Sequence, residues 1–505
     1  HLFAAAPQKR KKSKRLADPI KKQSPDVPHP ENELDTMPTS GGNANAGQRQ
    51  AITHGSGPLM IVAGPGTGKT TTLTRRIARL VEERKVPADQ ILAITFTDKA
   101  AREMQQRLAQ LLGDGQRPLT ATFHALCWQL RQEFSDDHTE SIIGEEDKLF
   151  IIAGIMRRMA AEGIKASLKP RKVAARIETA KQNLQGPDQF FESVAMESLD
   201  SQFARVYRQY QAFLQKEKRV DFDDLIFDVV VRLETDDLFR QALRNRFRHV
   251  LIDEYQDLNH AQYRLVKAIV PPDGNICVIG DPDQAIYGFR GSDTAYFNRF
   301  VEDFPGAEVI HLDRNYRSTE TILEASWQII RNRGRSAGPG MMGARLVSGK
   351  QGAPRLEVLE QSSEKAEAVA VGKIIEAQIG GTGFLAIDAG KVDSAAAAQD
   401  RSFADFAVLF RTARQAEVLA AVFTQAGIPF QLASRRKWLD QTGIAQLLAL
   451  YRLLHDAGSA HDLATAASAL QPALEKSLVN AFLDWKEGRK LSLSQALAMH
   501  TQLPG

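Results

Sequence analysis

The chain has 505 residues, 43% of them hydrophobic and 25% charged, and its formal net charge is +4. This composition excludes a fibrous or wholly disordered protein and predicts several hydrophobic cores in more than one domain. No run approaches the roughly 20 consecutive apolar residues that would span a bilayer. Because Cys127 and Cys277 lie far apart, neither a disulfide framework nor a metal cluster is predicted, and a cytoplasmic location is expected.

The N-terminal segment differs in composition from the rest of the chain. Residues 1–42 are rich in Pro, Lys, Ser, Gly and Asn and show no sustained periodicity. Residues 1–22 hold eight Lys or Arg against the single acidic residue Asp18. We expect a flexible basic tail or linker, with contact to nucleic-acid phosphates as the alternative. Folded structure is expected to begin near Asn43.

From residue 43 onward, short apolar runs alternate with helical patterns. We expect buried strands at residues 59–63, 91–96, 119–123, 250–252, 276–279 and 309–312. Continuous apolar strands separated by helices are typical of a parallel sheet covered on both faces. The sequence therefore predicts an α/β fold.

This rhythm is interrupted once and then resumes. Between about residues 132 and 248, amphipathic patterns such as 147–161 and 202–216 predict a helical insertion. A second α/β rhythm has expected strands at 356–359 and 406–410, expected helices at 364–378 and 413–426, and an expected exposed loop at 380–401. After residue 437 the pattern is helical.

A glycine-rich segment, AGPGTGKT at residues 63–70, follows the first expected strand and opens a helical pattern. In such loops backbone amides surround a β-phosphate, Lys69 would neutralise the β and γ oxygens, and the Thr70 hydroxyl would bind Mg²⁺. The sequence predicts a nucleotide site formed by Ala63, Gly64, Pro65, Gly66, Thr67, Gly68, Lys69, Thr70 and Thr71.

An acidic pair, Asp253 and Glu254, ends another expected strand. Such pairs are often helix caps, but beside a phosphate loop they suit hydrolysis. Asp253 would hold Mg²⁺, and Glu254 would orient and deprotonate the attacking water. Together with the loop, the pair predicts hydrolysis of a nucleoside triphosphate.

Six segments in a fixed order resemble the motifs of the UvrD/Rep family of superfamily 1 DNA helicases. They are NAGQRQA at 45–51, ITFTDKAAREM at 94–104, TFH at 122–124, DEYQD at 253–257, GDPDQAIYGFRG at 280–291 and LDRNYRS at 312–318. A further segment, FAVLFR at 406–411, resembles an internal strand of the family's second motor domain. Asp98 and Phe289 stand where Asn and Trp are commoner in the family.

The resemblance assigns roles around the nucleotide. It implies that Gln48 reads the adenine edge, Tyr316 stacks on adenine, and Gln284 and Arg317 contact the γ-phosphate. The implied cofactors are ATP and Mg²⁺. The expected catalytic set is Lys69, Asp253, Glu254, Gln284 and Arg317.

The resemblance also implies contacts with single-stranded DNA. Thr122 and His124 would meet phosphate oxygens, Phe96 would line a base pocket, and Tyr287 and Phe289 would stack on bases. Stacking of this kind is indifferent to sequence, because every base has a π face. The complete expected set is Thr95, Phe96, Thr122, His124, Tyr287, Phe289 and Arg290.

The family's architecture implies a domain division. Residues 43–135 and 216–305 would form RecA-like domain 1A, with helical insertion 1B at 136–215. Residues 306–433 would begin RecA-like domain 2A, and 434–505 would begin helical subdomain 2B. The implied function is an ATP-dependent single-stranded DNA translocase and helicase that moves 3′→5′ and works with repair or recombination proteins.

Two family motifs are absent from the sequence, a TxHxxKGLE-like segment and a later segment ending in TRA. Both follow 2B in the family. We therefore expect an incomplete motor whose second sheet has an exposed edge and whose hydrolysis is weak. Two alternatives stay open: the motor of a RecB/AddA-type helicase–nuclease, and a non-catalytic ATP-gated module that binds single-stranded DNA.

Overall fold

The computed structural model describes most of the chain after residue 43. The described residues are 44–113, 115–134, 140–164, 168–192, 199–331, 345–352, 354–379, 401–432, 441–455, 458–470, 476–489, 491–499 and 501. All of them fall in one unit, Ala44–Gly505. The expected basic tail, and the expected loop except for Arg401, lie outside the described residues.

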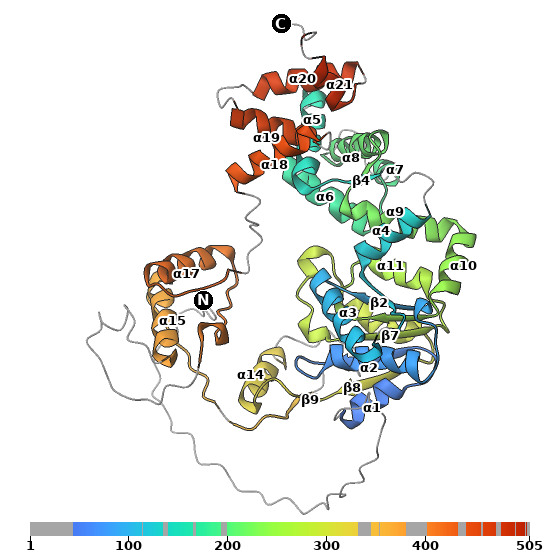
Figure 1. Cartoon of the computed structure of the whole chain (residues 1–505), viewed down its shortest axis with the longest axis vertical. Helices are drawn as coiled ribbons and strands as arrows, with labels where there is room; N and C mark the ends of the chain where they lie inside the picture. The colour runs from blue at the N-terminus through green and yellow to red at the C-terminus, as the bar shows by residue number, and fades with distance from the viewer. Residues whose placement is uncertain are drawn as a thin grey trace, which may run out of the picture. The chain divides into compact units, whose positions relative to one another are not determined.

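The central element is a six-stranded parallel sheet, as the sequence predicted (Figure 1). Its strand order is β3-β2-β6-β7-β1-β8, and every neighbouring pair is parallel. The strands are β1 (Leu59–Ala63), β2 (Ile91–Thr95), β3 (Leu119–Thr122), β6 (His249–Ile252), β7 (Asn275–Gly280) and β8 (Glu308–Leu312). Because β8 pairs with β1, the first sheet extends past the expected domain boundary at residue 305.

Helices cover both faces of the sheet, which explains why its strands are apolar without alternation. Successive side chains of a strand point to opposite faces. Leu59 and Ile61 therefore join one core with α1 (Ala46–Thr53), α2 (Lys69–Glu82) and α3 (Asp98–Leu112). Met60 and Val62 join the other core, whose helices are α4 (Phe123–Glu133), α9 (Phe222–Thr235), α10 (Asp237–Arg246), α11 (His260–Ile269), α12 (Ala295–Asn298) and α13 (Phe300–Asp303).

The helical insertion has a core of its own. Its helices are α5 (Glu145–Ala161), α6 (Pro170–Gln182), α7 (Pro187–Glu192) and α8 (Leu199–Lys216). Tyr207 and Tyr210 of α8 are fully buried among Ile and Met side chains of α5 and α6. A short parallel pair, β4 (Ser141–Ile142) with β5 (Arg219–Val220), joins the segments that enter and leave the insertion. The helical character predicted for this region is confirmed.

The second α/β rhythm is confirmed in its helices but not in its strands. The helices α15 (Glu364–Ile379) and α17 (Ala413–Gln425) pack on each other. The strands expected at 356–359 and 406–410 are wrong: both segments are described, and neither pairs with another strand. Val358 and Leu409 are each 93% exposed. A short apolar run shows which residues favour burial, but a strand also needs a partner backbone for its hydrogen bonds.

The remaining elements are a short strand pair with one helix and the helices of the C-terminal part. A parallel pair, β9 (Arg314–Asn315) with β10 (Val347–Ser348), lies next to α14 (Glu320–Arg331). The C-terminal part is helical as predicted, with α18 (Thr442–Leu454), α19 (Ala460–Leu470), α20 (Lys476–Gly488) and α21 (Leu493–Ala498). Among the residues that the structure describes, no helix is long and apolar enough to cross a membrane.

A pair of matched substitutions tests the difference between the central sheet and the unpaired segment at residues 356–359. Val278 in β7 is fully buried, so Val278→Ala should lower the free energy of unfolding by about 2 kcal/mol. Val358→Ala removes the same methyl groups from an exposed side chain and should change it by less than about 0.5 kcal/mol. Urea unfolding followed by circular dichroism measures both. An equal loss in the two variants would mean that residues 356–359 are packed in a sheet.

Candidate functional site

The segments that resemble motifs meet at one edge of the sheet. Parallel strands end at a common edge, where ligands of open α/β sheets bind. The phosphate loop follows β1, the acidic pair follows β6, and the segment with Gln284 follows β7. Residue 96 follows β2, residues 123–124 follow β3, and residues 313–317 follow β8. The sheet thus assembles residues that are far apart in sequence.

The phosphate loop has a fixed backbone conformation. Gly66 and Gly68 have positive φ angles of 71° and 85°, which residues with a Cβ rarely adopt. Thr67 is buried, and its hydroxyl donates to the Gly64 carbonyl at 2.8 Å. Gly68 is the N-cap of α2 and has no side chain over the helix start. The free N–H groups of the first turn are therefore open to an anion.

Three successive carbonyls of the loop accept hydrogen bonds from other elements. The Gln48 amide donates to the Thr67 carbonyl at 2.9 Å, and the Tyr316 backbone N–H donates to the Gly66 carbonyl at 2.8 Å. The Asn315 amide donates to the Pro65 carbonyl. The loop is thus held through its carbonyls, while its N–H groups at the start of α2 stay available for phosphate.

The rest of the loop is placed as follows. Ala63 is buried at the end of β1, and Thr70 is half-buried in the first turn of α2. The Thr71 hydroxyl accepts a hydrogen bond from Arg107 of α3 at 3.2 Å, so it faces that helix. Lys69 points toward the acidic pair, its Nζ 3.8 Å from Glu254 Oε2.

The acidic pair is electrostatically strained. Burial and the neighbouring Glu254 charge raise the pKa of Asp253 to about 7, although Lys69 opposes the shift. Glu254 has a positive φ of 52°, which costs a residue with a side chain about 1 kcal/mol. Asp257 has a buried Oδ1 that lacks a hydrogen-bond partner among the described residues. A cation next to Asp253 would lower its pKa again, because a positive charge favours the ionised carboxylate.

Gln256 links the acidic pair to the segment after β7, and sequence reasoning gave it no role. It is almost fully buried, and its Nε2 donates to Glu254 Oε2 at 2.9 Å and to Asp257 Oδ2 at 3.3 Å. Its Oε1 accepts from the Asp281 backbone N–H at 3.0 Å. Asp281 Oδ2 in turn accepts from Gln284 Nε2 at 2.5 Å. Gln256 lies within the DEYQD segment, so the sequence did contain a signal for it.

Gln48 lies beside the phosphate loop. Its Oε1 accepts from the Asn45 backbone N–H at 3.1 Å, and Asn45 Oδ1 accepts from the Gln48 N–H at 2.8 Å, forming the cap of α1. The Asn45 amide also donates to the Tyr316 hydroxyl at 3.0 Å. Gln48, Tyr316 and the phosphate loop are therefore neighbours, and Arg317 is exposed beside them. The contacts with adenine expected for Gln48 and Tyr316 stay predictions.

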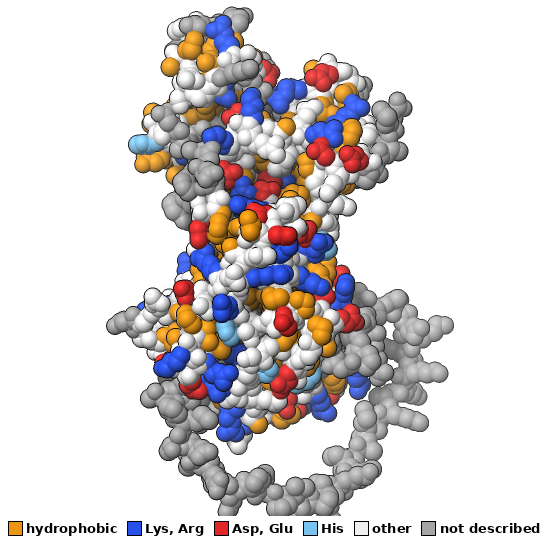
Figure 2. Space-filling model, turned by 90° about the vertical axis from the view of Figure 1, so that its right-hand side faces the viewer, with side chains coloured by type: hydrophobic (Ala, Val, Ile, Leu, Met, Phe, Trp, Pro, Cys, Tyr) orange, Lys and Arg blue, Asp and Glu red, His pale blue; other side chains and the backbone are white. Residues whose placement is uncertain are grey.

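A groove of about 850 Å³ lies between the sheet edge and the helical insertion. Phe96 and Tyr287 line it and stack, with ring centroids 5.3 Å apart and an interplanar angle of 29°. Phe289 is 78% exposed, and its ring lies 6.2 Å from that of Tyr287. His124 also lines the groove, and burial lowers its pKa. On the face drawn in Figure 2, basic side chains are interspersed with acidic ones.

Phe222 is a fourth aromatic residue of this groove that sequence reasoning missed. It is 56% exposed and meets the His124 ring edge-on, with centroids 6.1 Å apart. No role was assigned to Phe222 from the sequence. The preceding Asp221, which caps α9, is the only signal in the sequence that the ring lies at a helix end.

Two expected contacts, those of Thr95 and Thr122, are not at the groove surface. Thr95 is fully buried, and its hydroxyl donates to the Thr97 carbonyl at 3.2 Å, because the residue lies inside the sheet. The Thr122 hydroxyl caps α4 and donates to Asp98 at 3.3 Å, so its bonds are already used. The side chain of Arg290 lies outside the described residues.

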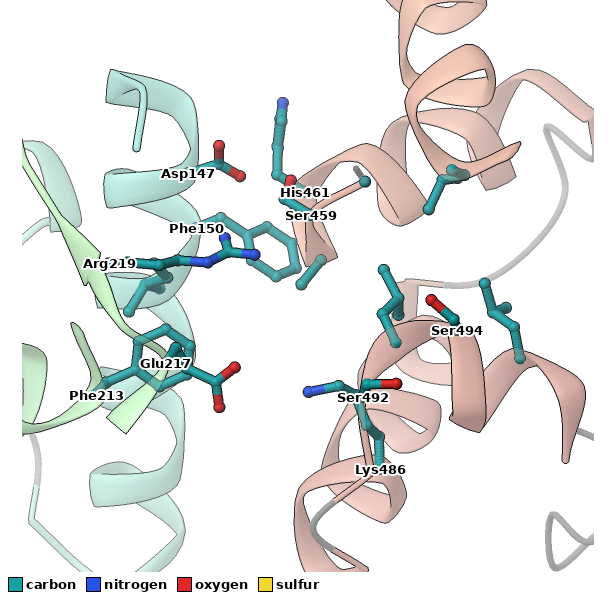
Figure 3. Close-up of a pocket in the computed structure, with 16 residues that line it drawn as sticks. Asp147, Phe150, Phe213, Glu217, Arg219, Ser459, His461, Lys486, Ser492 and Ser494 are labelled. Carbon is teal, nitrogen blue, oxygen red and sulfur yellow. The ribbon is translucent and has the colours of Figure 1, made fainter. Parts of the chain in front are cut away.

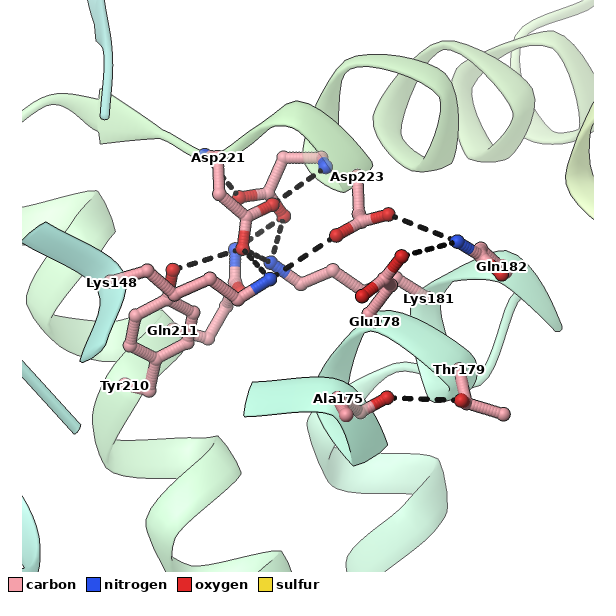
Figure 4. Close-up of polar contacts among 11 residues, drawn as sticks. Lys148, Ala175, Glu178, Thr179, Lys181, Gln182, Tyr210, Gln211, Asp221 and Asp223 are labelled. Atoms are coloured by element: carbon pink, nitrogen blue, oxygen red, sulfur yellow. Dashed lines mark hydrogen bonds and ion pairs between the residues drawn. The ribbon is translucent and has the colours of Figure 1, made fainter. Parts of the chain in front are cut away.

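A buried charge cluster holds the insertion against the start of α9 (Figure 4). Lys181 of α6 is 1% exposed and contacts Asp221 at 2.9 Å and Asp224 at 2.7 Å. Lys148 of α5 contacts Asp221 at 3.3 Å, and the Tyr210 hydroxyl donates to Asp221 at 2.9 Å. Burial alone would raise the pKa of Asp221, but the two lysines hold it below its ordinary value. The cluster therefore fixes the helix turn that presents Phe222.

A second cavity, of about 220 Å³, lies between the insertion and the C-terminal helices (Figure 3). Asp147, Arg219, His461 and Lys486 line it. It contains no residue of the motif-like segments. We assign the function to the sheet edge and the adjoining groove.

The parallel sheet, the phosphate loop after β1 and the acidic pair after β6 define a P-loop nucleotide-binding protein with a RecA-like fold. The UvrD/REP helicase N-terminal domain model matches residues 44–305, and the UvrD-like helicase C-terminal domain model matches residues 310–503. The chain belongs to the UvrD/Rep helicase family.

Several curated relatives are similar to most of the chain. The ATP-dependent DNA helicase PcrA of Staphylococcus epidermidis is 32% identical over 463 residues, which cover 90% of this chain and 60% of the relative. The ATP-dependent DNA helicase UvrD1 of Mycobacterium tuberculosis is 35% identical over 431 residues, covering 82% of this chain and 53% of the relative. The chain thus spans between half and two thirds of the length of these relatives.

Because the Asp253 carboxylate is buried beside Glu254, replacing it should raise the free energy of unfolding, and the increase should depend on pH. Because folding raises the pKa of Asp253 from near 4 to about 7, its cost to stability begins above pH 4 and is complete above pH 7. Without nucleotide or divalent cation, Asp253→Asn should stabilise the chain by about 1–3 kcal/mol at pH 8 and by less at pH 5. Thermal unfolding at both pH values measures the gain. The exposed Asp89→Asn is the control, and an equal gain at both pH values would contradict the prediction.

Breaking the buried charge cluster should destabilise the chain. Lys181→Met leaves Asp221 and Asp224 without their nearest cation and should lower the free energy of unfolding by about 3–5 kcal/mol. Lys172→Met, on the exposed side of the same helix, should change it by less than about 0.5 kcal/mol. Urea unfolding gives both values. If the two variants were equally stable, the cluster would not hold the insertion.

Proposed function

We propose that this chain binds ATP–Mg²⁺ and single-stranded DNA, and that the protein containing it is an ATP-dependent DNA translocase and helicase. One observation carries the proposal. The phosphate loop, the acidic pair and the stacked Phe96–Tyr287 pair lie at one sheet edge, and Gln256 joins the segments that follow β6 and β7. A nucleotide site and a base-stacking groove in such contact suit a motor that moves along DNA.

The residues at the sheet edge divide the work of hydrolysis. Lys69 and the N–H groups of the first turn of α2 would hold the phosphates. Thr70 and Asp253 would hold Mg²⁺, which offsets the negative charge of the phosphates when bound. Glu254 would orient a water and accept its proton, and its bond to Gln256 Nε2 fixes the carboxylate in direction.

The same contacts provide a route from the nucleotide to DNA. A change at Glu254 alters the partner of Gln256, which also holds the Asp281 backbone. Asp281 begins the segment that carries Gln284 and Tyr287. Movement of Tyr287 changes the stack with Phe96, and thereby the surface offered to a base. Arg317, presented by the segment after β8, would respond when the cleft closes on ATP.

Other features of the proposal come from family resemblance. The 3′→5′ direction, the cytoplasmic location, the repair or recombination partners and the division into 1A, 1B, 2A and 2B remain predictions. We place β8 with domain 1A, because it pairs with β1. In the RecB/AddA-type alternative, the protein that contains this chain would also carry a nuclease domain.

The segments at 356–359 and 406–410, which form no strand pair among the described residues, favour a second candidate for the chain by itself. Val358 and Leu409 are each 93% exposed, although Phe406 and Val408 pack against the core of α15 and α17. We infer that hydrolysis by the chain alone is weak. In that case it acts as an ATP-gated module that binds single-stranded DNA.

Hydrolysis and DNA binding distinguish the two candidates. We expect Tyr287→Ala to weaken binding of a labelled single strand by about 5- to 150-fold, the loss of one stacked base. Tyr451→Ala, an exposed ring on α18, is the control and should leave binding unchanged. Fluorescence anisotropy with and without ATPγS measures both variants, in low and high salt.

ATP turnover is then measured with and without the strand, beside the full-length Staphylococcus epidermidis relative. DNA-stimulated turnover that Glu254→Gln abolishes would establish a motor in this chain. Nucleotide-sensitive DNA affinity without turnover would establish the gated module. A chain that binds neither ATPγS nor the strand would refute both.

A further inference from the structure

Asn315 is a fully buried amide whose oxygen and nitrogen bind different parts of the site. Its Oδ1 accepts from the backbone N–H groups of Arg317 at 2.8 Å and Ser318 at 2.7 Å. Its Nδ2 donates to the Pro65 carbonyl in the phosphate loop. A buried Asn with both ends engaged fixes two backbone segments relative to each other.

We propose that Asn315 is the positioning residue that presents Arg317 to the γ-phosphate. The proposal rests on the nucleotide site described above and deepens it. The bonds from Oδ1 close an Asx-type turn, which sets the backbone direction at Arg317. The bond from Nδ2 fixes that turn to the loop that holds the phosphates.

The approach of the turn to the loop depends on Gly66. A Cβ at position 66 would lie 2.7 Å from the Arg317 Cβ and 2.8 Å from the Asn315 Nδ2, closer than atoms pack. The Tyr316 N–H donates to the Gly66 carbonyl at 2.8 Å within the same contact. The Arg317 backbone is thus held against the loop, whereas its exposed side chain can move.

The arrangement separates the two functions of the loop. Asn315 and Tyr316 use the carbonyls of Pro65 and Gly66 and leave the N–H groups of α2 for the phosphates. Loss of Asn315 would therefore leave the binding of α- and β-phosphates intact. It would misplace Arg317 and thereby weaken the binding of the γ-phosphate.

Two ligands report these effects separately. We would measure the affinities of the full chain for ATPγS and ADP with Mg²⁺ by calorimetry and take their ratio. Arg317→Ala should reduce the preference for ATPγS by about tenfold, the worth of a hydrogen bond to a charged group. Asn315→Ala should reduce it by a similar factor with ADP affinity unchanged. The double variant should lose no more than either single one, because the two residues act as a unit.

Asn315→Asp keeps the acceptor for Arg317 and Ser318 but removes the donor to Pro65. It should also lose the preference, and it carries the test if Asn315→Ala fails to fold. Asn275→Asp is the matched control, because Asn275 likewise bridges two backbone segments, Gly57 and Arg248, away from the loop. The ratio of ATPγS affinity to ADP affinity in Asn275→Asp should equal that of the unmodified chain.

The outcomes separate this inference from the proposed function. An unmodified chain that binds neither ligand would overturn both. A preference for ATPγS that Arg317→Ala removes and the Asn315 variants keep would overturn only the role of Asn315. Equal loss of ADP and ATPγS affinity in the Asn315 variants would also overturn it, since that pattern indicates a structural role.

Discussion

All six strands of the central sheet run in one direction, and that constraint brings the site together. A parallel strand must return to its start through a crossover, so every segment that follows a strand emerges at the same edge. The two apolar cores bury the sheet from both sides and make this arrangement rigid. The phosphate loop, the acidic pair and the aromatic residues of the groove are therefore presented by a frame that does not need the ligands to form.

Within this frame, polar contacts decide what the edge can do. Gln256 is almost fully buried, and burying an amide is favourable only when its hydrogen bonds are satisfied. Its partners are Glu254 and Asp257 on one side and the Asp281 backbone on the other. A change in the direction of the Glu254 carboxylate must alter this set of bonds. The proposed coupling of nucleotide to DNA would thus be local, over the ends of two neighbouring strands.

Much of this architecture could be predicted from the sequence. Continuous apolar runs located all six strands of the first sheet, because both of its faces are covered. The same reasoning failed at Val358 and Leu409, where no second strand within the described part of the chain completes a ladder. The phosphate loop and the acidic pair could be proposed from the sequence because their chemistry is local in sequence. No role was predicted for Gln256, Asn315 or Phe222, because their partners lie on other elements. The burial of Thr95 was not predicted, because depth in the sheet is a tertiary property.

The phosphate loop illustrates how little of a site's order needs to come from its ligand. Carbonyls of Pro65, Gly66 and Thr67 are each bound by a different donor, from the segments around Asn315 and Gln48. A loop held on that side keeps its positive-φ glycines in place and its N–H groups open at the start of α2. Less conformational entropy is then lost when a phosphate binds. The same carbonyls also connect the loop to the segments that carry Gln48, Tyr316 and Arg317, while the N–H groups at the start of α2 are left for the phosphates.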